Sequence, residues 1–146
     1  MRINESELFC GISPAVMDMI SQIMIKETGE KGIFLFHTGD PAKYFYILQD
    51  GRISICADKK DHAVSFVHIP GELFGWSCLV DRNAYSASAE YVVHSTVLKI
   101  EKEKLVSLLQ KNPADGCVFY KNFATIIGRR FLDTCNVKDW FPSIAS

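Results

Sequence analysis

The stretch from Gly71 to Ala89 holds the residues best suited to chemistry in this chain. It reads GELFGWSCLVDRNAYSASA. Two glycines lead into a short apolar turn, and a run of small residues follows. Gly75 has no Cβ, so an anion can come close to the backbone amides around it. The spacing therefore predicts a backbone cradle for a phosphate or a similar anion.

Short runs rich in β-forming residues surround this stretch and must position it. Turn residues separate the runs, and Asp50-Gly51 between two apolar runs is typical of a hairpin. Many short strands at close spacing indicate a sandwich, barrel or jelly roll. The predicted strands are 33–36, 44–48, 52–57, 63–69, 84–91 and 95–100.

Helical patterns lie on both sides of the strand region. Residues 13–25 have apolar side chains at helical spacing, with Ser13 as the cap and Pro14 in the first turn. After the strands, the pattern predicts a helix over residues 101–110 and a long amphipathic helix over about 114–132. The last residues, 133–146, are predicted to be a tail.

Three motifs together resemble those of the cyclic-nucleotide-binding domain family. Phe36–Leu48 followed by Gly51 is similar to the family's signature hairpins. Pro70–Trp76 is similar to the start of its phosphate-binding cassette, and Tyr85–Ala89 to the strand that leaves it. They occur in the family's order and at its separations, and the resemblance covers roughly residues 8 to 132.

The resemblance implies a mainly β fold with flanking helices. The expected architecture is a double-stranded β-helix, a jelly-roll-like β-roll, with one N-terminal helix and two C-terminal helices. We therefore expect one domain over residues 1–132 and a C-terminal tail over 133–146. Its function would be that of a regulatory or sensor module in signal transduction, with a small molecule as its ligand.

Two positions depart from the family's ligand contacts. The glutamate that accepts a hydrogen bond from the ribose is replaced by Trp76, and the arginine that pairs with the cyclic phosphate by Tyr85. Each lost hydrogen bond to a charged group would weaken binding by roughly 1.5–3 kcal/mol. Together they correspond to about 10²- to 10⁴-fold in affinity. We therefore predict that cyclic AMP and cyclic GMP are not bound by the usual contacts.

The residues of this region leave two interpretations of the site open. A cassette that keeps its amides and serines could bind a cyclic nucleotide or another small organic anion, with Arg82 as a phosphate ligand if the alignment is shifted. Alternatively, Trp76 and Tyr85 fill the hollow, and the domain is a ligand-free structural or protein-interaction module. The predicted ligand-binding residues are Phe74, Gly75, Trp76, Ser77, Arg82, Tyr85, Ser86 and Ala87.

The pattern of histidines, serines and cysteines does not favour an enzyme or a metal protein. The four histidines are dispersed over the strands, and neither Ser77 nor Ser86 has a base nearby in sequence. The five cysteines include no CxxC pair, which disfavours a zinc site. The sequence therefore predicts neither catalytic residues, nor a metal site, nor a required cofactor.

Charge and the ends of the chain set the expected partners. A net charge of −1 provides no basic surface for nucleic acid. No signal peptide and no apolar run of membrane length is visible, so we expect a cytoplasmic protein without a membrane partner. Transcription factors of the family carry a helix-turn-helix domain after the long helix, whereas this sequence continues for about 14 residues.

The long C-terminal helix is also expected to form a homodimer. In the family this helix often pairs with a second copy, and here it has a wide apolar face. That face contains Val118, Phe119, Phe123, Ile126, Ile127 and Phe131.

Overall fold

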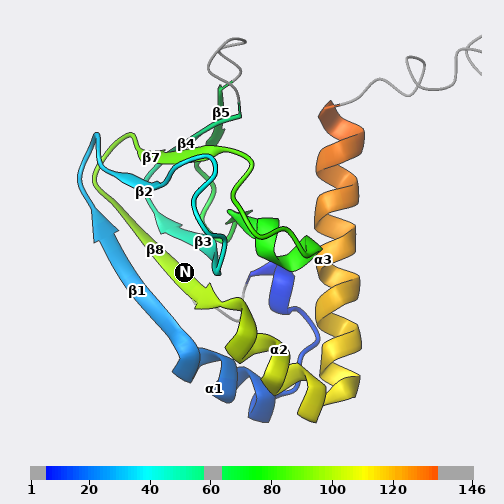
Figure 1. Ribbon diagram of the computed structural model, residues 1–146. Helices are drawn as coiled ribbons and strands as arrows, with labels where there is room; N and C mark the ends of the chain where they lie inside the picture. The colour runs from blue at the N-terminus through cyan, green and yellow to red at the C-terminus, as the bar shows by residue number, and fades with distance from the viewer. Residues whose placement is uncertain (1–5, 58–63, 135–146) are drawn as a thin grey trace, which may run out of the picture.

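The structure is a computed structural model that describes residues 6–57 and 64–134. Within these residues the chain forms a helical N-terminal part, eight strands and two C-terminal helices (Figure 1). The elements are η2 (Glu7–Phe9), α1 (Pro14–Ile23), β1 (Met24–Gly29), β2 (Phe34–Phe36), β3 (Tyr44–Asp50), β4 (Ile53–Cys56), β5 (Val64–Val67), β6 (Leu73–Phe74), η3 (Trp76–Val80), β7 (Ser88–Tyr91), β8 (Ser95–Glu101), α2 (Lys102–Lys111) and α3 (Pro113–Thr134).

The strands form two antiparallel sheets that face each other and wind into a roll (Figure 1). One sheet has the order β1-β8-β3-β6 and the other the order β2-β7-β4-β5. Neighbouring strands in each sheet are often far apart in sequence, as in a jelly roll. The predicted mainly β fold with one N-terminal helix and two C-terminal helices is confirmed.

The segment 24–29 is a strand, whereas the sequence predicted that the first helix would reach residue 25. The helix ends at Ile23, where its apolar repeat of Val16, Ile20 and Ile23 also ends. From Met24 the chain pairs with β8, and this pairing satisfies backbone N–H and C=O groups of β8. In β1 the consecutive residues Ile25 and Lys26 are both exposed, so the period-2 signal of a half-buried strand is weak.

Strand β3 is buried on both of its faces. Phe45 and Ile47 point to the helical side, where Phe45 contacts Phe119 of α3 with ring centroids 6.4 Å apart. Tyr46 points into the roll, where its ring lies 5.5 Å from Phe36. Successive side chains on a strand point to opposite faces, so one strand joins the interior of the roll to the helical layer.

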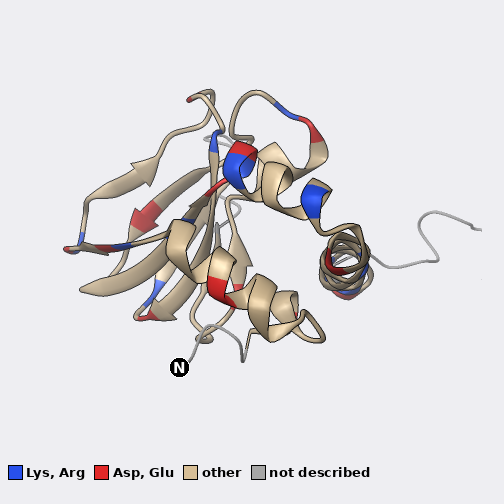
Figure 2. Cartoon of the chain, turned by 90° about the horizontal axis from the view of Figure 1, so that it is seen from below, with Lys and Arg blue, Asp and Glu red and all other residues tan. Residues whose placement is uncertain are grey.

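Helix α3 runs along one side of the roll, standing apart from the sheets in the end-on view (Figures 1 and 2). It begins with Pro113, which suits a first helical position, and buries Phe119, Phe123 and Ile126. The helix extends to Thr134, two residues beyond the predicted boundary. The rest of the predicted tail lies outside the described residues.

Candidate functional site

The predicted cassette is an irregular segment between two short strands. After β6, Gly75 adopts a left-handed conformation with φ 64° and begins the five-residue 3-10 turn η3. Asp81 ends the turn with φ 58°, and the chain then passes Tyr85 before it joins β7 at Ser88. Two left-handed residues therefore fix the direction in which this turn leaves and rejoins the roll.

Gly75 lies against aromatic rings of the roll. A Cβ at this position would be 2.9 Å from Cδ2 of Tyr46 and 3.0 Å from Cε2 of Phe36. The sequence suggested that the missing side chain lets an anion approach the amides. The contacts supply a second reason for glycine, since both the positive φ and the two rings disfavour any larger residue.

Tyr85 is buried inside the roll and is held at both ends. Its ring stacks on Phe36 with centroids 3.8 Å apart and planes at 14°. Its hydroxyl donates to the carbonyl oxygen of Tyr44 at 2.7 Å. Burial raises the pKa of Tyr85 to about 12, so the phenol is neutral at physiological pH. The residue that the sequence motifs place at the family's arginine position is thus an uncharged, packed ring.

Trp76 has different neighbours from Tyr85. Its ring meets Phe123 of α3 edge-on, with centroids 6.0 Å apart and planes at 72°. The Trp76 side chain is half-buried, and Phe123 is buried. Trp76 therefore connects the cassette to α3.

The other predicted site residues are divided between the interior and the surface. Phe74 and Ser77 are buried, and Phe74 stacks on Tyr46 at 5.2 Å. Arg82 and Ser86 are exposed, and Ala87 is half-buried. The structure thus brings Phe74, Gly75 and Tyr85 to one aromatic cluster and leaves Arg82 and Ser86 on the surface.

The ionisable groups of the cassette do not form a reactive set. Cys78 is buried, and desolvation raises the pKa of its thiol to about 11, which keeps it protonated and unreactive. Among the described residues, no group of three His, Cys, Asp or Glu side chains could hold a metal ion. Residues of both charge signs are interspersed over the fold in the view of Figure 2.

Three residues of this site were not predicted as part of it. Phe36 and Tyr46 come from β2 and β3, and Phe123 comes from α3. Tyr46 could have been found from strand alternation, which turns it to the side opposite Phe45. Phe123 could not, because only the tertiary structure brings α3 next to η3.

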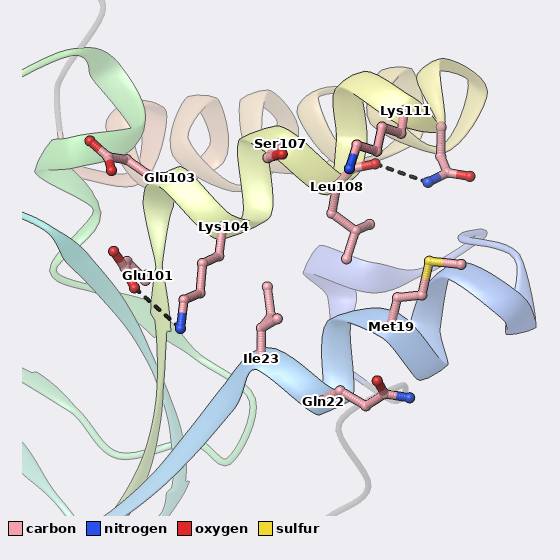
Figure 3. Close-up of a pocket in the computed structure, with 10 residues that line it drawn as sticks. Met19, Gln22, Ile23, Glu101, Glu103, Lys104, Ser107, Leu108 and Lys111 are labelled. Atoms are coloured by element: carbon pink, nitrogen blue, oxygen red, sulfur yellow. Dashed lines mark hydrogen bonds and ion pairs between the residues drawn. The ribbon is translucent and has the colours of Figure 1, made fainter.

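Two cavities lie away from the cassette residues 74–87. One, of about 660 Å³, is a groove between α1 and α2, where Ile23 and Leu108 point toward each other (Figure 3). An ion pair of 3.7 Å between Lys104 and Glu101 lies at one end of this groove. The other cavity, of about 480 Å³, lies between the N-terminal segment, the loop before β6 and the last turns of α3.

The chain belongs to the cyclic nucleotide-binding domain family. The family model with the description "Cyclic nucleotide-binding domain" matches residues 26–112, more than half of the chain. This match and the two-sheet roll agree with the resemblance inferred from the three motifs. Among the described residues, no helix is long and apolar enough to cross a membrane.

Relatives of known name support this assignment. The chain is 26% identical over 128 residues to the cyclic AMP receptor protein of Thermus thermophilus, covering 86% of this chain and 57% of that protein. It is 31% identical over 107 residues to the transcriptional activator protein anr of Pseudomonas aeruginosa, covering 70% of this chain and 43% of that protein. The chain thus spans about half the length of these curated relatives.

A solved structure has a similar fold. The catabolite activator protein of Thermus thermophilus superposes with a TM-score of 0.73 at 25% identity, covering 88% of this chain and 60% of that chain. The relatives are named as receptor and activator proteins, so the family is one of regulatory domains.

Proposed function

We propose that this domain is a non-catalytic regulatory module that does not hold cyclic AMP or cyclic GMP through the usual glutamate and arginine contacts. The observation that carries the proposal is the burial of Tyr85 at the arginine position, stacked on Phe36 at 3.8 Å. A cyclic phosphate at this position would have to displace the ring, and it would meet a neutral phenol instead of a guanidinium.

The output of such a module is the position of α3. The cassette touches this helix through Trp76 and Phe123, so a shift of η3 alters the surroundings of the helix. A ligand or partner changes this position only by binding one arrangement more tightly than the other. In this proposal, signalling through α3 does not require the family's usual ribose and phosphate contacts.

Two versions of this module differ in what occupies the roll. In the first, a small organic anion binds at the cassette through backbone amides and through Ser77 or Ser86. In the second, the roll takes no ligand and the domain acts through protein contacts. The aromatic packing of Tyr85, Phe36 and Tyr46 favours the second version, because these rings already occupy the space beside Gly75.

Calorimetric titration with cyclic AMP and cyclic GMP tests the proposal. We expect no micromolar binding to the wild-type protein, and a micromolar dissociation constant would contradict it. If binding occurs and Arg82→Ala abolishes it, Arg82 is the phosphate ligand. A thermal-shift screen over small metabolic anions separates the two versions, since a ligand of the native state raises the melting temperature.

We further propose that the domain forms a homodimer through α3. Phe119, Phe123 and Ile126 of the predicted apolar face are buried against the rest of the domain, so the interface would use apolar side chains of α3 that remain exposed. These are Phe131 of the predicted face, together with Tyr120 and Leu132. Light scattering at high micromolar concentration checks this, and Leu132→Asp should lower the dimer fraction. A wild-type protein that stays monomeric would exclude it.

The expected setting of the module is the cytoplasm, with neither nucleic acid nor a membrane as partner. Cys10, Cys78 and Cys117 are free thiols, which fits a reducing compartment. The net charge of −1 provides little attraction for nucleic acid. Binding of labelled duplex DNA at low salt would contradict this part of the proposal.

A further inference from the structure

Three pairs of consecutive residues meet beside the last turns of α3. Ser6 and Glu7 come from the N-terminal segment, Gly71 and Glu72 from the β5–β6 loop, and Arg129 and Arg130 from α3. All six line the cavity of about 480 Å³. We call this set the three-way junction.

Each part of the junction contacts the other two. The Oγ of Ser6 donates to the carbonyl oxygen of Gly71 at 3.1 Å. Arg129 donates to both carboxylate oxygens of Glu7, at 3.1 and 2.6 Å. Arg130 reaches the carboxylate of Glu72 with an N–O distance of 4.0 Å. A movement of any one part therefore strains contacts to both of the others.

The N-terminal segment follows α3 well beyond the junction. Asp115 accepts hydrogen bonds from the amide and the hydroxyl of Ser13, at 2.8 and 2.9 Å. Asn122 donates to the carbonyl oxygens of Leu8 and Cys10, at 3.0 and 2.8 Å. With Arg129 these side chains are seven residues apart, which places them on one side of the helix. The segment and the helix are thus joined along two thirds of the helix length.

Glu72 connects the junction to the cassette. Its Oε1 accepts the amide N–H of Ile69 at 2.9 Å, while its Oε2 faces Arg130. The same loop continues directly into β6 and Gly75. The carboxylate therefore fixes the loop that leads into the cassette and, at the same time, faces the helix.

The charges of the junction act on one another. Hydrogen bonds from Arg129 hold the pKa of Glu7 below its usual value, with Arg130 adding to the effect. Burial lowers the pKa of Arg130, while Glu72 and Glu7 both oppose that shift. Arg130 thus experiences the carboxylates of two segments that are 65 positions apart in sequence.

We propose that the three-way junction couples the β5–β6 loop, the N-terminal segment and the end of α3, so that displacing one part loosens the other two. The inference rests on the proposed function, in which the position of α3 is the output. Ion pairs as exposed as that between Arg129 and Glu7 contribute little to stability, so the contact is easily reversed. The junction would let the cassette loop and the N-terminal segment adjust the same helix.

Hydrogen–deuterium exchange of the ligand-free protein tests the coupling. Glu7→Arg places three cationic side chains together and should speed exchange of amides 127–134 by about two- to fivefold. The decisive readout is the loop at residues 69–73, which should accelerate as well, although the Glu7 side chain is bonded to Arg129 and not to this loop. Exchange within β3 should stay unchanged, because global stability does not depend on this pair.

Charge-matched variants complete the test. Glu103→Arg makes the same charge change on the exposed surface of α2 and should alter neither segment. Glu7→Arg combined with Arg129→Glu should restore slow exchange in both. If exchange in β3 also rises with Glu7→Arg, the charge reversal destabilises the whole domain, and the milder Glu7→Gln is used in its place. Faster exchange in α3 with an unchanged loop, or failure of the charge swap to restore either segment, would overturn the coupling. Neither result depends on whether a nucleotide binds.

Discussion

The interior of the roll beside the cassette and the three-way junction are held together in opposite ways. Around Tyr85 the contacts are between buried rings. The ring centroids of Tyr85 and Phe36 are 3.8 Å apart, and those of Phe36 and Tyr46 are 5.5 Å apart. At the junction the contacts are ion pairs and hydrogen bonds whose side chains are partly in water. Both regions border the same short segment, because residues 71–75 run from one to the other.

Because of this difference, we expect the two regions to control different properties, namely the stability of the domain and the position of α3. Removing a buried aromatic ring lowers the free energy of unfolding strongly, since the surrounding side chains do not refill the vacated volume. Breaking exposed polar contacts costs little free energy, since water molecules replace the lost partners. Substitutions inside the roll should therefore change how stable the domain is, and substitutions at the junction should change where α3 lies.

The largest effect is expected from Tyr85→Ala. It removes a buried ring and leaves the carbonyl of Tyr44 without its donor, so the free energy of unfolding should fall by about 3–5 kcal/mol. Urea denaturation measures this. Ile33→Ala, which shortens a side chain with 57% of its surface exposed, is the control and should lower the free energy of unfolding by less than about 1 kcal/mol. Equal losses in both variants would mean that the roll is not tightly packed.

Substitutions of two glycines should change the stability of the domain by intermediate amounts and in opposite directions. Gly75→Ala combines a positive φ with a Cβ placed 2.9 Å from Tyr46, and should destabilise by about 1–3 kcal/mol. Gly128→Ala lies in α3 with open space around its Cβ, and should stabilise by about 0.5–1 kcal/mol. Thermal unfolding of both variants compares them. A neutral Gly75→Ala would show that the rings yield easily, and the contrast with the junction would disappear.

The smallest effect is expected from Tyr85→Phe and depends on pH. Losing the hydrogen bond to Tyr44 should cost about 0.5–1.5 kcal/mol at neutral pH. Above pH 10 the unfolded chain loses the phenolic proton before the folded protein does, because the folded pKa is raised to about 12. Stability should therefore fall between these pH values, by up to about 1.4 kcal/mol per pH unit for each such tyrosine.

Stability curves of the wild type and Tyr85→Phe from pH 9 to 12 provide the comparison. The free energy of unfolding of the variant should depend less steeply on pH, by the contribution of about one titrating proton. Tyr91, whose pKa burial also raises to about 12, should keep part of the slope in both proteins. Parallel curves would place Tyr85 in contact with water.

The roll was predictable from the sequence because its signals are local. Asp50-Gly51 marks a turn between apolar runs, and β3 and β8 follow their predicted ranges closely. Strand β1 was missed because an edge strand with exposed Ile25 and Lys26 has no clear alternation. The two-residue strand β6 is too short to carry a pattern of its own.

The side-chain directions at the cassette could not be predicted in the same way. Period-2 alternation fails across η3, where Gly75 and Asp81 turn the backbone through left-handed conformations. The motifs predict from position alone that Trp76 and Tyr85 replace the family's glutamate and arginine, and this stays a prediction. That Tyr85 stacks on Phe36 while Trp76 reaches Phe123 depends on contacts between segments distant in sequence. The junction is equally non-local, since Glu7 and Arg129 are separated by 122 positions.

The contact between Trp76 and Phe123 also gives the protein a built-in optical probe. Indole emission responds to its immediate surroundings, so any separation of η3 from α3 would alter the fluorescence of Trp76. The sequence contains two tryptophans, and Trp140→Phe would leave Trp76 as the single emitter. Rearrangements of the helix could then be timed in solution without attaching a dye.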